Sequence, residues 1–516
     1  MKKQSKKSKI YLLISIFVII IGVVLRTYHL FLVGFSKPWG AGGLYLEFAR
    51  QIFQNNYSLP IIIPHYTYGG LPFAYPPLPF YIESLLVFSL SLPEYLIVNL
   101  LPPFVSILSL ILFFILIKNV LKNKYAQLFS LVLYSITPIC FMEQVEGAGL
   151  AESFGTLFII LLLLVFWLYY QSPYRMTRLI LSSLVWGLTV MASPASAYLS
   201  VFIFFTLFFM LIRKEKGNLI KMILYILIMG LLAVLLSSLY LGTVIRNHGL
   251  GLLINSFVSQ HEGSFFIFSF FVRLAKMDLI INEPILSILF ITALFVLLYN
   301  KKFELLFMSL FSVLIPRENW IMGIVGILMI GVATDLILSY LPDKFLQKEI
   351  QKFSVLVTII AVAGILLLRP LYFVLTRDLI WKHSLDTSQI RLLENIKVDS
   401  TSRENLIILG NNEFLEWAPY ITEKSVLNVW FGTELAPSKF WVQDAHASLI
   451  DCKNIECVNH NIGRNFGADA VSVVIDLNFI DDFQTENFSD VETETPIKII
   501  NDRFIFYSMD EFSDYN

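Results

Sequence analysis

The stretch from Gly34 to Ile82 reads GFSKPWGAGGLYLEFARQIFQNNYSLPIIIPHYTYGGLPFAYPPLPFYI, and it decides how the rest of the chain is interpreted. Glycine and proline recur through it too densely for a long helix or a sheet. It also contains no apolar run long enough to cross a bilayer. Because one very apolar segment precedes it and a series of others follows, we expect a shaped loop that lies over a membrane-embedded bundle.

One short helical pattern lies inside this loop. Leu44, Phe48 and Ile52 recur every four residues, while charged residues fall elsewhere on the helical wheel. The pattern predicts an amphipathic helix over Gly43–Phe53 at the membrane surface. Packing on neighbouring segments alone is the alternative. Because long ordered loops on rigid scaffolds tend to carry function, we expect the loop to cover a substrate site.

Composition assigns the chain to the polytopic membrane proteins. Of its 516 residues 56% are hydrophobic and only 15% are charged, and its mean hydropathy is +0.70. Soluble chains carry about 25% charged residues. The net charge of −1 gives no reason to expect nucleic acid as a partner. The lysine-rich start and the long apolar run after it predict a retained first span with a cytoplasmic N-terminus.

The positive-inside rule yields eleven spans, with a cytoplasmic N-terminus and an extracytoplasmic C-terminus. They are Ile10–Arg26, Glu94–Ile117, Tyr125–Met142, Ser153–Tyr170, Leu179–Met191, Ala195–Ile212, Leu219–Leu241, Glu283–Tyr299, Phe303–Ile315, Trp320–Leu341 and Phe353–Leu368. The short apolar segment Pro77–Leu92 is expected to pack at the surface or dip in without crossing, because counting it would place the lysine-rich loops on the wrong side.

From about Pro370 charged residues become common, and we expect a soluble extracytoplasmic α/β domain over residues 370–516. Predicted strands are Asn405–Leu409, Ala470–Ile475 and Ile497–Tyr507. Cys452 and Cys457 would form a disulfide in an extracytoplasmic domain and would be free thiols in a cytoplasmic one; we favour the disulfide. Their spacing is a poor match to a zinc site.

Polar side chains gather at the expected outer ends of the spans, and they are the candidate site residues. The first loop contributes Glu47, Arg50, His65 and Tyr75, the turn after the third span Glu143, Glu146 and Glu152, and a later turn Arg317, Glu318 and Asn319. Carboxylates at a bilayer boundary are costly unless they are paired or hydrated, so they are candidates for function.

Each candidate also has a structural alternative. Glu152 can instead favour a helix start through the helix dipole, and Glu143 and Glu146 fit a hydrated loop. Arg317 can clamp a phosphate bidentately or simply extend its charge to the interface. For His65 a structural hydrogen bond is favoured over catalysis, and the loop aromatics form either an interfacial belt, the default, or a stacking surface for sugar rings.

The order of these motifs resembles the GT-C superfamily of polytopic glycosyltransferases, especially its protein O-mannosyltransferase and lipid A aminoarabinose transferase branch. FAYPPLPFY at Phe73–Tyr81 looks like that family's proline-containing helix entry, and the Ala-Glu-Ser-Phe run around Glu152 looks like its second acidic motif. The resemblance spans most of the chain and rests on the order and sidedness of the motifs. It implies a GT-C-like transmembrane domain over residues 1–369 and a polyprenyl-phosphate-linked sugar donor.

The family's first-loop acidic pair falls here on Ala41 and Gly42, so both acids are absent. The resemblance implies that Glu152 or Glu47 serves as catalytic base or positions a divalent cation, and that a basic residue at Arg317 meets the lipid phosphate. Arg50 is a second candidate for the donor phosphate. Candidates for further substrate contacts are His65, Tyr75, Glu146, Glu318 and Asn319.

The leading hypothesis is therefore a membrane glycosyltransferase that moves a sugar from a polyprenyl-phosphate donor to an acceptor at the outer face. A second hypothesis is a catalytically inactive relative that binds lipid-linked sugar or a partner, since Ala41 and Gly42 replace the acids. A transporter is a third hypothesis, and the lack of paired half-helices or an inverted repeat in the sequence disfavours it.

Overall fold

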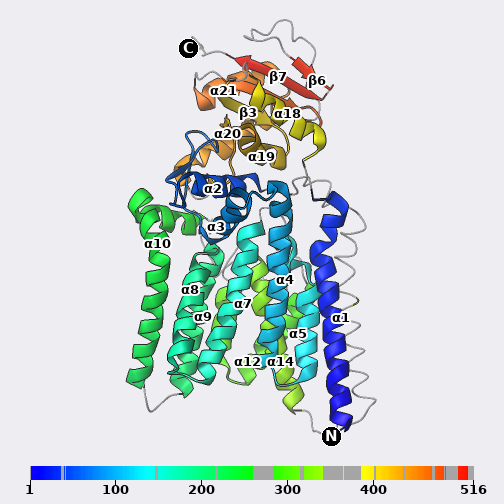
Figure 1. The fold of residues 1–516 in the computed structure, drawn as a ribbon, viewed down its shortest axis with the longest axis vertical. Coiled ribbons are helices and arrows are strands. Elements are labelled where there is room, and N and C mark those ends of the chain that lie inside the picture. The colour runs from blue at the N-terminus through cyan, green and yellow to red at the C-terminus, as the bar shows by residue number, and fades with distance from the viewer. Residues whose placement is uncertain are drawn as a thin grey trace.

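The computed structural model describes residues 2–35, 40, 42–145, 149–214, 219–259, 284–313, 319–340, 364, 385–399, 403–433, 436–467, 471–480, 483, 498–501 and 503–509. Most of these residues are helical, and the long helices lie side by side as a bundle below a small sheet (Figure 1). The bundle helices are α1 (Lys2–Val33), α4 (Glu94–Val120), α5 (Lys124–Ile136), α7 (Leu150–Gln171), α8 (Met176–Val190), α9 (Pro194–Lys214), α10 (Leu219–Ser259), α12 (Pro284–Tyr299), α13 (Phe303–Val313) and α14 (Asn319–Tyr340).

Ten of the eleven predicted spans coincide with one of these helices, which confirms a multi-pass helical membrane protein. Six helices are long and apolar enough to cross a bilayer, and a seventh span is possible if one bent pair counts as a single crossing. The helices α8, α12 and α13 are shorter than a full crossing. The last predicted span, Phe353–Leu368, lies outside the described residues apart from Gly364.

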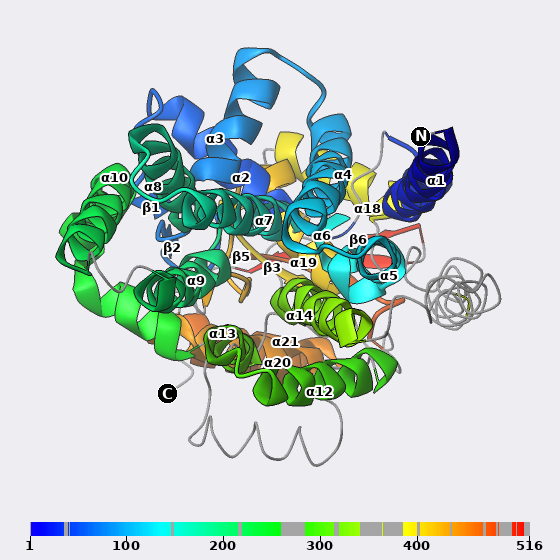
Figure 2. The same cartoon turned by 90° about the horizontal axis from the view of Figure 1, so that it is seen from below.

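The N-terminus and the C-terminal sheet lie at opposite ends of the bundle (Figure 1). The loop after α4 lies at the end near the N-terminus, where the backbone N–H of Asn123 donates to Asp335 Oδ1 at 2.7 Å. At the same end Arg213 pairs with Glu304 at 3.5 Å. Viewed along the spans (Figure 2), α7 packs among α4, α8 and α9, whereas α1, α10 and α12 lie at the periphery.

The third predicted span differs from the structure at its upper end. We expected one helix over Tyr125–Met142, but α5 ends at Ile136, and the chain bends by 84° before η2 (Pro138–Cys140) and α6 (Met142–Val145). Pro138 explains the break, because proline lacks the N–H that would continue the helical ladder.

The first loop lies between the bundle and the sheet (Figure 1). Its elements are α2 (Gly43–Gln54), the paired two-residue strands β1 (Ile62–Ile63) and β2 (Leu71–Pro72), α3 (Leu78–Ser84) and the π-helical turn η1 (Leu85–Ser89). The predicted amphipathic helix over Gly43–Phe53 is thus present with nearly the same bounds. The segment Pro77–Leu92 contains only α3 and η1, both too short to cross, and α3 packs on α2.

The C-terminal region forms a mixed five-stranded sheet in the order β4-β3-β5-β7-β6. Its elements are α18 (Thr387–Val398), β3 (Asn405–Leu409), α19 (Asn412–Thr422), β4 (Ser425–Val426), η5 (Pro437–Lys439), α20 (Trp441–Ile450), α21 (Ile455–Phe466), β5 (Val471–Asp476), β6 (Lys498–Ile500) and β7 (Phe504–Met509). Strands β4, β3 and β5 are parallel, and β7 runs antiparallel to both β5 and β6. The last predicted strand, Ile497–Tyr507, is therefore two strands joined by a turn.

Both faces of this sheet are covered, which is why its strands are continuous apolar runs. Alternate residues of β3 point to different cores. Ile407 packs with α20 and α21, whereas Ile408 belongs to a core that also contains Phe48 of α2, Phe154 of α7 and Trp417 of α19. One hydrophobic core is thus shared by the first loop, the start of a span and the C-terminal sheet.

Candidate functional site

Glu47 and Arg50, two candidates from the first loop, pair with each other on α2. Glu47 is fully buried, and its Oε2 lies 3.2 Å from Arg50 Nη1. Burial raises the pKa of Glu47, while Arg50 and the hydrogen bond from Gln51 oppose that rise. The guanidinium of Arg50 also donates to the carbonyl of Tyr420 at 3.0 Å and lies over its ring at 3.9 Å. The pair therefore faces the C-terminal domain, and Arg50 lines a pocket of about 300 Å³ together with Tyr420 and Glu423 of that domain.

His65 and Tyr75 occupy separate parts of the first loop. The backbone of His65 has a positive φ of 69°, and its carbonyl accepts a hydrogen bond from Val426 at the edge of the sheet. Burial lowers the pKa of its half-buried imidazole. Tyr75 packs in a cluster of aromatic rings, with centroids 5.8 Å from Tyr45 and 5.9 Å from Phe80. The structure describes no contact between His65 and Tyr75.

The second acidic turn lies at the end of the bundle that faces the sheet. Glu143 is on α6, and Glu152 is half-buried in the first turn of α7. The two helices approach so closely at Gly149 that a Cβ there would lie 2.1 Å from the Glu143 carbonyl oxygen. Glu146 lies outside the described residues.

Asn319, one of the later candidates, belongs to the same end of the bundle. Asn319 begins α14, and four residues on, a Cβ at Gly323 would lie 3.0 Å from Cys140 Sγ in the turn before α6. Arg317 and Glu318 lie outside the described residues, immediately before α14. The start of α14 and the second acidic turn are therefore neighbours, whereas Glu47 and Arg50 lie above them in the loop.

Arg26 is a buried cation that sequence reasoning missed, because it was taken as the end of the first span. It has no exposed surface, and it donates to the carbonyls of Tyr134 and Ser135 at 3.2 and 3.1 Å and to Ser106 Oγ at 3.1 Å. Pro138 is the residue whose N–H would have bonded Tyr134 in a continued helix, so Arg26 supplies the missing donor. A charge inside an apolar run was the available signal.

Glu83 of α3 was also missed. It is 2% exposed, and its Oε2 has no hydrogen-bond partner among the described residues. Burial raises the pKa of this carboxyl to about 8. Helix α3 packs on α2 and on α7, the helices that carry Glu47 and Glu152. Sequence alone gave no signal here, because a single glutamate in a short apolar helix is equally typical of an exposed position.

The structure gives no support for a metal centre. Within the described ranges no three His, Cys, Asp or Glu side chains converge on one point. Cys452 and Cys457 are joined as a disulfide, as favoured from the sequence.

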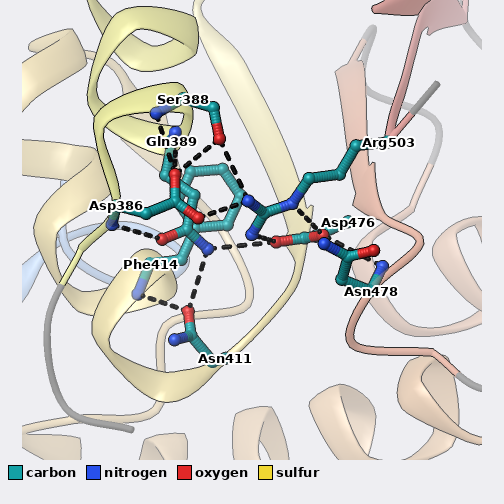
Figure 3. Close-up of polar contacts among 8 residues, drawn as sticks. All are labelled: Asp386, Ser388, Gln389, Asn411, Phe414, Asp476, Asn478 and Arg503. Atoms are coloured by element: carbon teal, nitrogen blue, oxygen red, sulfur yellow. Dashed lines mark hydrogen bonds and ion pairs between the residues drawn. The ribbon is translucent and has the colours of Figure 1, made fainter. Parts of the chain in front are cut away.

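The most connected polar network lies in the C-terminal domain (Figure 3). Arg503 donates two hydrogen bonds to Asp476 at 2.9 and 2.7 Å and also pairs with Asp386. Gln389 joins Asp476 to Asn411 at the ends of β5 and β3. Parallel sheets often bind ligands at this edge. Here the charged groups pair with one another, which indicates that the network stabilises the C-terminal domain.

Candidate residues thus occupy two levels at the end of the bundle that faces the sheet. The lower level, at the ends of α6, α7 and α14, holds the half-buried carboxylate of Glu152. The upper level is α2 and α3, which cover the bundle and carry buried carboxyls. Such an arrangement can hold a charged headgroup at the membrane boundary and present a carboxylate to it.

The chain is similar to known proteins in structure. Neither a family model nor a curated protein sequence matches the chain. Among solved structures it is similar to the archaeal oligosaccharyltransferase AglB from Archaeoglobus fulgidus, with a TM-score of 0.58, 13% identity, and coverage of 92% of this chain and 70% of that chain. It is similar to ArnT from Cupriavidus metallidurans, with a TM-score of 0.56, 11% identity, and coverage of 96% and 97%.

A third similarity is to the arabinofuranosyltransferase AftD from Mycobacteria, with a TM-score of 0.51, 11% identity, and coverage of 90% of this chain but only 37% of that chain. At such low identities the similarity concerns the fold. All three structures are GT-C glycosyltransferases, and the resemblance noted in the sequence is confirmed at that level. The chain therefore has the fold of the GT-C membrane glycosyltransferases.

Proposed function

We propose that this protein transfers a sugar from a polyprenyl-phosphate-linked donor to an acceptor on the side of the membrane where the C-terminal domain lies. The observation that carries the proposal is the match to ArnT, which covers nearly the full length of both chains. The AglB structure contains a dolichol-phosphate, so one protein of this fold binds a lipid of the proposed class. The lysine-rich loops of the sequence support a cytoplasmic N-terminus and an extracytoplasmic C-terminal domain.

In the proposed reaction an acceptor hydroxyl attacks the anomeric carbon of the donor sugar. A new bond forms between the hydroxyl oxygen and that carbon, and the bond to the lipid phosphate oxygen breaks. Glu152 takes the hydroxyl proton as general base. Arg317 stabilises the departing lipid phosphate, which leaves as an anion. Asn319, Glu318, Glu146, His65 and Tyr75 are the proposed substrate contacts.

Glu152 is the better candidate for the base than Glu47. Glu47 is fully buried and has Arg50 at 3.2 Å, so its negative charge is already neutralised. The charge of Arg50 is engaged by the same pair, which makes Arg50 a weaker candidate for the donor phosphate. Glu152 is half-buried at the start of α7, a helix that contacts α14. We therefore assign Glu47 and Arg50 the role of holding α2 in place.

The test is turnover of a labelled polyprenyl-phosphate sugar by the full-length protein in lipid nanodiscs. Glu152→Gln is expected to lower the rate by about 10²–10⁴-fold, the usual contribution of a general base. Glu304→Gln, at the opposite end of the bundle, is the matched control and should leave the rate unchanged. Equal turnover by the wild type and Glu152→Gln would remove Glu152 from the mechanism.

One observation favours the second candidate function, a catalytically inactive relative that binds a lipid-linked sugar. Gly42 is at the start of α2 where the family resemblance places an acid, and the first-turn N–H groups of that helix are already occupied by Glu416. Measurable binding of the labelled donor, with the donor recovered unchanged after long incubation, would support this alternative over the enzyme.

A further inference from the structure

The N-terminus of α2 is capped by a carboxylate from the far end of the chain. Glu416 Oε2 accepts from the N–H groups of Gly42 and Gly43, both at 3.0 Å, and Oε1 accepts from Leu44 at 2.7 Å. The N-cap residue of the helix, Gly42, is a glycine and has no side chain that could make this bond. A carboxylate at this position satisfies otherwise orphaned N–H groups and interacts favourably with the helix dipole.

The contact requires the two backbones to approach closely. A Cβ on Gly43 would lie 2.9 Å from Trp417 Cα and 3.0 Å from the Glu416 carbonyl oxygen. The first distance is shorter than real Cβ contacts and the second is at the tight limit, and both involve backbone atoms that cannot rotate away. Glycine is therefore needed at position 43 for α19 to reach α2.

Three more hydrogen bonds join the first loop to the same part of the C-terminal domain. Trp417 Nε1 donates to the Gly40 carbonyl at 2.8 Å, and Tyr66 Oη donates to the Glu416 carbonyl at 2.9 Å. The Val426 N–H donates to His65 at 2.9 Å, which makes the loop an extra edge beside β4. Residues that precede and follow α2 in the chain are therefore attached to the C-terminal domain, through α19 and through β4.

We propose that Glu416 is a positioning residue that couples the C-terminal domain to the first loop, so that the two form one unit. Through this carboxylate, α19 sets the orientation of α2 and hence of the Glu47–Arg50 face. The inference does not depend on the proposed function, because it concerns how the loop is held over the bundle. Removal of the carboxylate loosens both the loop and the edge of the sheet, including segments distant from the cap.

The proposal is distinguished from simple helix capping by moving the carboxylate. Glu416→Ala removes the cap, and adding Gly42→Asp to it restores an acid at the N-cap of α2 without restoring the link to α19. The φ of Gly42 is −175°, an extended value that aspartate can adopt. Aspartate is among the preferred N-cap residues. Glu456→Ala, an exposed first-turn acid of α21, is the matched control.

Hydrogen–deuterium exchange of the full-length protein in nanodiscs measures both effects. In Glu416→Ala, exchange of residues 43–54 and of residues 65–66 and 425–427 should quicken by about fivefold or more, the scale of a lost cap. With Gly42→Asp added, residues 43–54 should recover, whereas the sheet edge stays fast. The Glu456→Ala control should match the wild type in both segments.

Two results would overturn the proposal: exchange unchanged in Glu416→Ala, or recovery of both segments in the double variant, which would make Glu416 a local cap only. If Glu416→Ala does not fold, Glu416→Gln and Tyr66→Phe are measured in its place. Glu416→Gln retains one acceptor oxygen, and Tyr66→Phe removes a single hydrogen bond. Exchange at the wild-type rate at the sheet edge in both variants would refute the coupling. Exchange requires no turnover, so failure to detect glycosyl transfer leaves this test intact.

Discussion

The buried pair on α2 allows a structural role to be separated from a catalytic one by a double-mutant cycle. Glu47→Gln leaves Arg50, which is 14% exposed, without its nearest carboxylate. Removing one partner of a buried ion pair costs about 3–5 kcal/mol. Glu423 lies 3.5 Å from Arg50 but is half exposed, so it provides only a weak substitute. We therefore expect a loss near the lower limit, about 3 kcal/mol.

Arg50→Met leaves the opposite problem, a buried carboxyl without a cation. That carboxyl can take up a proton, so Arg50→Met should be less destabilised at acidic pH than at neutral pH. In the double variant neither charge is left alone. Its loss should therefore be smaller than the sum of the two single losses, and the difference is the interaction energy.

Apparent melting temperatures of the four proteins in one detergent, at one scan rate, measure this cycle. Glu394→Gln, an exposed carboxylate on α18, is the control and should melt with the wild type. Strictly additive losses, or an unchanged Glu47→Gln, would refute the ion-pair reasoning. If Glu47 is only structural, the double variant should also regain donor turnover that Glu47→Gln loses; a catalytic Glu47 would leave both inactive.

Gly43→Ala should destabilise by about 1–3 kcal/mol through overpacking against Trp417, whereas Gly230→Ala, whose added methyl meets only ordinary contacts, should melt with the wild type. Arg26→Met should lower the melting temperature and expose the bend after α5 to proteolysis, because two buried carbonyls lose their donor; a variant as stable as the wild type would contradict this capping role. Burial raises the pKa of Asp386, but its hydrogen bonds more than offset that effect and hold the pKa below its ordinary 3.8. Its stabilisation is therefore present above pH 3.8 and lost as pH falls below it. In Asp386→Asn the melting temperature should depend less on pH in that range.

Local patterns predicted most helices because hydrophobic length and four-residue spacing report directly on spans and on α2. The break after α5 was missed, although Pro138 was visible, because an apolar run continues past it and hydropathy does not register a missing N–H. The strand Asn405–Leu409 was predicted with its observed bounds, since a buried parallel strand is a short apolar run between turn residues.

Long-range pairing could not be predicted in this way. Nothing in the sequence around Glu416 indicates that its carboxylate bonds Gly42, 374 residues away. For the same reason Glu47 was interpreted as a candidate base, when its environment is set by Arg50 and by a helix from another part of the chain. The roles of Glu47, Arg50, Glu152, Arg317 and the substrate contacts stay predictions.

The carboxylate that caps α2 is synthesised long after the helix that needs it. At 5–20 residues per second, a ribosome takes roughly 20–75 s to pass from Gly42 to Glu416. During that time the nascent loop has emerged but has no acceptor for its first N–H groups, and its apolar face has no sheet to pack against. The first loop therefore cannot mature until synthesis has passed residue 416. Nascent chains arrested before residue 416 should display residues 43–75 to proteases and chaperones.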